Sequence, residues 1–232
     1  MSTVYLIRHG QASFGADNYD CLSDKGRLQA QLLGRHLADL LKHPPHVIAG
    51  SMQRHQDTAK LALTESFPDA VIHTDAQWNE FDHHQVFAKY DQRFESPALL
   101  KQAIVEADNP SAYFDELFSA AAGQWSNPTY AHLYQESWQQ FQQRIAQALE
   151  QLIVYLTTQP TANVLLFSSG GVISTAVGQL LDLTMLKTFQ LNWSIANCSI
   201  SSIRIQDLKA QLLSLNEHQF IKVHAPHLLT WL

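Results

Sequence analysis

Four separate segments of the chain carry polar side chains, and the arginines among them suit the binding of an anion. Arg8 and His9 lie near the N-terminus, Arg54 lies in the second segment, Glu80 in the third, and a Ser-Ser-Gly-Gly run spans residues 168–171. Guanidinium groups match phosphate oxygens in a bidentate way, and a glycine-rich helix start adds backbone N–H donors. Arginines of this kind also form ordinary ion pairs, so the residue types alone leave both interpretations open.

Each of these segments follows a short apolar run that is typical of a buried strand. The runs are residues 4–7, 47–49, 70–72 and 164–167. Leucines at helical spacing behind Ser23 predict a helix that ends at Pro44 and Pro45. Further helices are expected over residues 53–65, 136–157 and 172–183.

The alternation of strands and helices predicts an α/β fold with a mostly parallel central sheet and helices on both faces. Ligands bind such sheets at the carboxyl ends of the strands, so we expect the four segments to meet at one rim. Residues 199–205 and 211–215 predict a late hairpin that turns at residues 207–209. Residues 82–134 break the alternation and are interpreted as a helical insertion over the active-site end. Residues 1–232 contain no linker and no internal repeat and are expected to form a single domain.

The composition excludes several classes of protein. The formal net charge is −6, from 15 basic and 21 acidic residues, which argues against a nucleic-acid-binding or anionic-membrane surface. No apolar run approaches the roughly 20 residues of a membrane span, and the N-terminus lacks the features of a secretory signal. We therefore expect a cytoplasmic protein, whose oligomeric state stays open.

The cysteines and several histidines do not suggest a metal site. Cys21 and Cys198 have neither metal-ligand spacing nor a disulfide framework, and they are expected to be buried, reduced thiols. His43, His46 and His55 lack carboxylate or cysteine partners at metal spacing and are interpreted as surface residues. We therefore expect no metal and no cofactor.

Several motifs follow one another in a recognisable order. Residues 6–11 read Leu-Ile-Arg-His-Gly-Gln, and residues 22–30 read Leu-Ser-Asp-Lys-Gly-Arg-Leu-Gln-Ala. Residues 51–59 hold Arg54, and Glu80 follows the third expected strand. An Arg-His-Gly triplet alone is weak, but this ordered set resembles the histidine phosphatase superfamily, also called phosphoglycerate mutase-like, over most of the chain outside the insertion.

The resemblance implies a phosphoryl transfer in two steps. His9 would attack phosphorus as the neutral imidazole and form a phosphohistidine, which water then hydrolyses. Arg8 and Arg54 would bind the phosphate oxygens, a task that Mg²⁺ performs in other phosphoryl-transfer enzymes. Glu80 would protonate the leaving oxygen and afterwards activate water.

The chain departs from the pattern of the superfamily at two positions. The fourth motif is normally Ser-His-Gly-Gly, so Ser169, before Gly170, stands where a second phosphate-binding histidine is expected. Ser169 and Gly170 are still expected to bind phosphate, although losing one charged donor costs roughly 10²–10³ in rate. A similar Ser-Gly-Gly variant in a bacterial branch leaves open that the change defines a subgroup. Gly15 stands where many members place a phosphate-contacting asparagine, which Asn18 could replace only if the loop folds back.

Four further side chains are candidates for the pocket. Gln11 and Ser13 follow the first motif, and they either line the entrance or cap the loop. His83 and His84 follow Glu80 closely, and they either supply the missing positive charge or belong to a polar loop.

These observations predict a metal-independent phosphomonoesterase that acts on a small phosphate ester through a phosphohistidine. The alternative, motivated by Ser169, is a pseudo-enzyme that binds a phosphate ligand with little turnover. A phosphoglycerate-type mutase has less support, because Phe-Asp-His-His follows the glutamate in place of the longer mutase motif. The expected partner is a small phosphorylated substrate or phosphate, with no nucleic acid and no membrane, and residues 82–134 would select the substrate.

Overall fold

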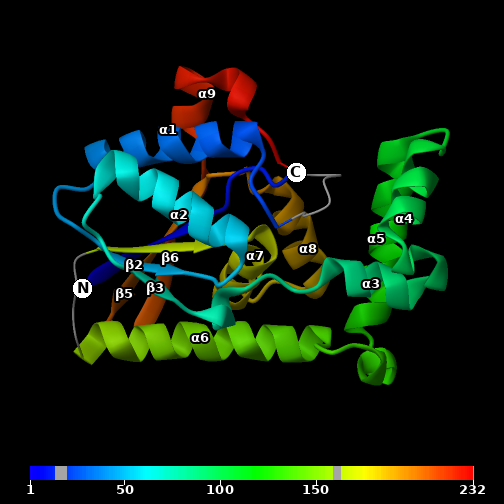
Figure 1. Ribbon diagram of the computed structural model, residues 1–232. Helices are drawn as coiled ribbons and strands as arrows, with labels where there is room; N and C mark the ends of the chain where they lie inside the picture. The colour runs from blue at the N-terminus through cyan, green and yellow to red at the C-terminus, as the bar shows by residue number, and fades with distance from the viewer. Residues whose placement is uncertain (14–19, 159–162, 232) are drawn as a thin grey trace. The chain divides into compact units, whose positions relative to one another are not determined.

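The computed structural model describes residues 1–13, 20–158 and 163–231 (Figure 1). The chain divides into two compact units, one formed by Met1–Glu80 with Ile145–Leu232 and the other by Phe81–Arg144. Within the described ranges, no helix is long and apolar enough to cross a membrane.

The first unit contains a six-stranded sheet in the order β3-β2-β4-β1-β5-β6. The strands are β1 (Ser2–Arg8), β2 (His46–Ala49), β3 (Ile72–Thr74), β4 (Asn163–Ser168), β5 (Ile200–Gln206) and β6 (Lys209–Glu217). Strands β1 to β4 run parallel, whereas β5 and β6 pair in antiparallel fashion at one edge. The predicted α/β fold with a mostly parallel sheet is therefore confirmed.

Helices cover both faces of this sheet (Figure 1). Helices α1 (Asp24–Leu40), α2 (Gln53–Ser66) and α9 (Gln219–His224) lie on one side, where Leu33, Leu37 and Phe167 belong to a shared apolar core. The part of α6 (Trp138–Thr158) from Ile145 onward lies along the opposite side. This unit also holds α7 (Gly170–Leu180), α8 (Met185–Ser194), η1 (Ala76–Trp78) and η4 (Pro226–Leu228).

Local sequence signals explain how α1 begins and how β1 ends against it. Ser23 is the N-cap of α1, and its Oγ accepts the Gly26 N–H at 3.0 Å, as the capping pattern predicts. A Cβ atom on Gly10 would fall 2.5 Å from the Gly26 carbonyl oxygen. Glycine at position 10 therefore lets the chain leaving β1 pack directly on the first turn of α1.

The late hairpin and the edge strand show where local patterns succeed and fail. Strands β5 and β6 form the expected hairpin, and Asp207 and Leu208 turn it with positive φ angles of 51° and 59°. The third strand was expected over residues 70–72, but β3 is Ile72–Thr74. Among the described strands, β3 pairs with β2 alone, and Val71 is 70% exposed. The apolar run at residues 70–72 therefore does not mark a buried strand.

Two other expectations need correction. Helix α7 begins at Gly170, two residues before the predicted start at residue 172, so Gly170 and Gly171 form part of its first turn. Cys198 is buried, and burial raises the pKa of its thiol, but Cys21 is only partly buried, contrary to expectation. Both thiols are free.

The second unit, Phe81–Arg144, contains the short helical pieces expected over residues 82–134 and extends further. These pieces are α3 (His83–Tyr90), η2 (Gln92–Glu95), α4 (Pro97–Val105), α5 (Pro110–Ser126) and η3 (Pro128–Leu133). The ring of Trp125 lies 4.6 Å from Phe81 and 5.3 Å from Trp138, centroid to centroid, so the unit has an aromatic core of its own.

Candidate active site

The candidate side chains follow the carboxyl ends of three neighbouring strands, β1, β4 and β2. Strand β4 lies between β1 and β2, and Arg8 pairs with Ser168 in the register of β1 and β4. The next residues, His9 and Ser169, therefore leave adjacent parallel strands side by side, and His9 N–H donates to the Ser168 carbonyl at 2.9 Å. Arg54 lies in the first turn of α2, just after β2.

The imidazole of His9 is held in one neutral form. Its Nδ1 lies 2.7 Å from the Gly10 carbonyl oxygen, and Arg54 Nε–H donates to its Nε2 at 3.2 Å. A carbonyl only accepts and a guanidinium only donates, so this network assigns the proton to Nδ1 and a lone pair to Nε2. Burial, and then the charges of Arg54 and Arg8, lower the pKa of His9 well below its ordinary value. His9 is therefore neutral, and the lone pair of its Nε2 accepts from the Arg54 guanidinium.

The C-terminal part of the chain positions Arg8. Its Nη1 donates to the carbonyl oxygens of Ile195 and Trp231, the latter at 2.7 Å. Asn197 Nδ2 donates to the carbonyl of His9 at 3.2 Å. These contacts cannot be predicted from the sequence, because carbonyl acceptors leave no signal in a side-chain pattern.

Arg54 connects His9 to the carboxylate of Asp20, which no sequence motif indicates. Its Nη1 donates to Asp20 Oδ1 at 2.8 Å, and Asp20 Oδ2 accepts the Gln53 N–H at the start of α2, also at 2.8 Å. One turn later, Thr58 Oγ1 accepts the Gly10 N–H at 3.0 Å. These contacts hold the first turn of α2 against the end of β1.

Glu80 lies at the N-terminus of α7. Its Oε2 accepts the Gly171 N–H at 2.9 Å, while Ser169, the N-cap residue, makes no capping bond of its own. A carboxylate at a helix start is stabilised by the helix dipole. Glu80, Ser169 and the buried Gly170 thus lie at one helix terminus, which is also the end of β4.

His55 is the main correction to the sequence analysis of the site. It was interpreted as a surface residue, but its side chain is fully buried and its ring centroid lies 5.7 Å from that of His9. Its Nε2 lies 2.6 Å from the Oγ of Ser169. Burial, followed by the charge of Arg54, lowers the pKa of His55 well below its ordinary value. The one sequence signal was its position directly after Arg54.

Gln11 and Ser13 both form hydrogen bonds in the loop after β1. Gln11 Oε1 accepts from the Ser23 hydroxyl at 3.0 Å, and its N–H donates to Gln29 Oε1 at 2.7 Å. Ser13 N–H donates to the Cys21 carbonyl at 2.8 Å. The contacts of Gln11 connect the loop after β1 to the start of α1.

Gly15 and Asn18 lie outside the described residues. His83 and His84 belong to the second unit, where they form the first turn of α3 behind the N-cap Asp82.

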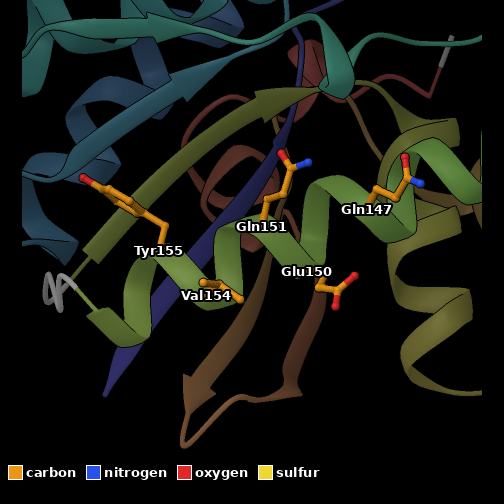
Figure 2. A pocket seen from close by; sticks show the side chains of 5 residues that line it. All are labelled: Gln147, Glu150, Gln151, Val154 and Tyr155. Carbon is orange, nitrogen blue, oxygen red and sulfur yellow. The ribbon is translucent and has the colours of Figure 1, made fainter.

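A separate hollow of about 610 Å³ lies along α6 (Figure 2). Its lining side chains are Gln147, Glu150, Gln151, Val154 and Tyr155. It offers a carboxylate and amides but no cationic side chain, so it does not suit an anion. Among the described residues, no group of three or more His, Cys, Asp or Glu side chains could hold a metal ion.

Comparison with known proteins decides the family. Residues 4–103 and 104–218 match the sequence profile of the histidine phosphatase superfamily (branch 1). The chain belongs to this superfamily. Over 64 residues it is 41% identical to the mitochondrial serine/threonine-protein phosphatase Pgam5 of Drosophila virilis, a match that covers 27% of this chain and 22% of that relative.

Solved structures share the fold of this superfamily member. A phosphoglycerate mutase from Bacillus anthracis str. Sterne superposes with a TM-score of 0.66 at 19% identity, covering 95% of each chain. A putative alpha-ribazole-5'-P phosphatase from Escherichia coli str. K-12 gives a TM-score of 0.62 at 22% identity, covering 94% of this chain and 98% of the other.

Proposed function

We propose that this superfamily member is a phosphomonoesterase that hydrolyses a small phosphate ester through a phosphohistidine at His9, without a metal ion. The observation that carries the proposal is the protonation state of His9. Gly10 accepts from Nδ1 and Arg54 donates to Nε2, which leaves a nucleophilic lone pair beside a guanidinium. A neutral histidine next to fixed positive charge suits attack on an anionic phosphoryl group.

In the first step, Arg54 Nε–H shifts from His9 Nε2 to a phosphoryl oxygen. The freed lone pair of Nε2 forms a bond to phosphorus while the bond from phosphorus to the ester oxygen breaks. Arg8 and Arg54 neutralise charge on the phosphoryl oxygens, which is why we expect no metal ion. Glu80, in its protonated form, gives its proton to the leaving oxygen. The ring of His9 keeps its Nδ1 proton, and the Gly10 carbonyl stabilises the positive charge that the ring gains.

In the second step, water hydrolyses the phosphohistidine. The carboxylate of Glu80 takes one proton from the water while the water oxygen bonds to phosphorus and the nitrogen–phosphorus bond breaks. His9 returns to its neutral Nδ1–H form, inorganic phosphate leaves, and Glu80 is protonated again for the next cycle.

A second candidate is a pseudo-enzyme that binds a phosphate ligand with little turnover. The neutral hydroxyl of Ser169 favours it, because a serine cannot supply the charge of a histidine. We favour the phosphatase over the pseudo-enzyme, since the proposed nucleophile, His9, and the proposed proton donor, Glu80, are both present. A cytoplasmic location and a small phosphorylated substrate, without nucleic acid or membrane, are further parts of the proposal.

The test is a panel of small phosphate esters and a phosphoserine peptide, combined with trapping of labelled enzyme. We expect hydrolysis of a small ester, an acid-labile and base-stable phosphoprotein, and an unchanged rate in the presence of a chelator. His9→Ala should lose both the label and the activity, whereas His43→Ala, at an exposed histidine outside the site, should lose neither. Phosphate binding without turnover would favour the pseudo-enzyme, and full activity of His9→Ala would rule out the mechanism.

A further inference from the structure

We propose that His55 is a positioning residue that orients the hydroxyl of Ser169 as a neutral donor to a phosphoryl oxygen. The inference rests on the proposed phosphatase function and assigns a role to a residue that the mechanism above does not use. The pair would supply a hydrogen bond, while Arg8 and Arg54 supply the charge.

The contact between the two side chains is short and buried. Ser169 Oγ and His55 Nε2 lie 2.6 Å apart, and the two residues are 1% and 0% exposed. Ser169 leaves β4 beside His9, and the rings of His55 and His9 lie 5.7 Å apart. The pair therefore lies next to the nucleophile.

The hydroxyl of Ser169 does not form the capping hydrogen bond that is usual for an N-cap serine. An N-cap serine normally accepts a backbone N–H from the first turn of its helix. In α7, Glu80 accepts the Gly171 N–H at 2.9 Å, and Ser169 makes no capping bond. Glu80 thus stabilises the helix terminus and leaves the Ser169 hydroxyl to interact with His55.

The surroundings of His55 indicate which nitrogen carries its proton. Among the described residues, Nδ1 has no hydrogen-bond partner, and it lies so close to Gly50 that a Cβ atom there would fall 2.2 Å from it. A buried N–H without an acceptor is rarer than a buried acceptor without a donor. The proton therefore belongs on Nε2, which donates to Ser169 Oγ, and the hydroxyl proton is left to point at a ligand.

The charge state of His55 fits a purely neutral role. Burial and the nearby Arg54 lower the pKa of His55, so the ring adds a donor without adding charge. Removal of one preorganised neutral donor typically costs about 10²–10³ in rate where it is a main stabiliser of the transition state. Because Arg8 and Arg54 also bind the phosphoryl oxygens, we expect a smaller loss here, of about 10- to 100-fold.

A double-mutant cycle tests the pair. Ser169→Ala and His55→Leu should each lower kcat/KM by about 10- to 100-fold. The double variant should be no more than about twofold worse than Ser169→Ala, because coupled residues are not additive. His55→Gln keeps an amide donor near the position of Nε2 and should retain at least about fivefold more activity than His55→Leu. Multiplying losses, or no advantage of glutamine, would overturn the proposal.

Controls separate this inference from folding and from the proposed function. Ser202→Ala removes a buried hydroxyl in β5 that bonds to Ser214, and it should leave kcat/KM unchanged. Denaturant unfolding of each variant identifies losses that come from misfolding. If the wild-type protein hydrolyses no ester, the phosphatase proposal fails, but binding of inorganic phosphate to the same variants still tests the role of His55 and Ser169. That role would be ruled out if Ser169→Ala bound phosphate and turned over substrate as well as wild type does. It would also be ruled out if the wild-type protein bound no phosphate.

Discussion

The carboxylate of Asp20 lies 2.8 Å from Nη1 of Arg54, the same arginine that donates through Nε to His9. The Arg54 side chain is 5% exposed, and that of Asp20 is 36% exposed. A phosphate group that binds beside His9 must therefore share Arg54 with a carboxylate. We expect this arrangement to orient the guanidinium while limiting the affinity for the phosphate product.

Asp20→Asn should tighten the binding of inorganic phosphate, because it removes a negative charge next to the site and keeps an acceptor for Arg54. For a partly exposed pair we expect a gain of roughly two- to tenfold, measured as competitive inhibition. Glu65→Gln makes the same charge change in an arginine pair at the other end of α2 and serves as the control. Weaker phosphate binding by Asp20→Asn would show that orienting Arg54 is the more important role.

Arg54→Ala should weaken the binding of vanadate or phosphate by roughly 1.5–3 kcal/mol, the usual contribution of a hydrogen bond to a charged group. Arg35→Ala is the matched control, since Arg35 is exposed and pairs with Glu65 outside the site. Titration of both variants with vanadate gives the comparison. Unchanged affinity in Arg54→Ala would mean that the anion binds elsewhere.

Glu80→Gln should lower kcat much more than it lowers phosphate affinity. The amide oxygen of glutamine can still accept the Gly171 N–H, so the start of α7 is preserved, but glutamine cannot transfer a proton. Loss of a general acid–base group typically costs about 10²–10⁴ in rate. Steady-state kinetics, together with phosphate inhibition, separate the two effects, and a change confined to KM would point to a positioning role.

Ser169→His should lower activity, because the ring of His55 already lies 2.6 Å from the Ser169 hydroxyl and leaves no space for a second imidazole. Overpacking a buried site typically costs about 1–3 kcal/mol, so we expect about tenfold or more in kcat/KM. Adding His55→Ala makes room and should recover part of the loss. Higher activity of the single variant would favour the interpretation of a weakened phosphatase that lacks one charged donor.

Stability should fall in acid, since His9 and His55 are both buried with pKa values below the ordinary value of about 6.5 that applies in the unfolded chain. Below that pH the unfolded state binds protons that the folded state does not, so the free energy of unfolding is greatest above pH 6.5 and decreases as the pH falls below it. Urea unfolding at pH 7.5 and 5.5 measures this loss. His55→Gln should reduce the slope by up to about 1 kcal/mol per pH unit, and a substitution of the exposed His43 should not.

The sequence by itself determined the local features of this protein. The continuous apolar run of β4 predicts burial on both faces, and five of its six positions are buried. The cap at Ser23 and the hairpin turn at Asp207 depend on residues only a few positions apart, so their patterns are visible without the fold. The order of the motifs likewise indicated which side chains follow the carboxyl ends of the parallel strands.

Only the tertiary structure decided how those side chains are partnered. His55 and Ser169 lie 114 positions apart, and Arg8 and Trp231 lie 223 positions apart. Their contacts exist because β4 inserts between β1 and β2, and because the C-terminal segment returns to the end of β1. Arg54 and His55 are polar residues near the start of α2, and both are buried. Their burial depends on which strand ends lie beside α2, and that strand order is not encoded in any local pattern.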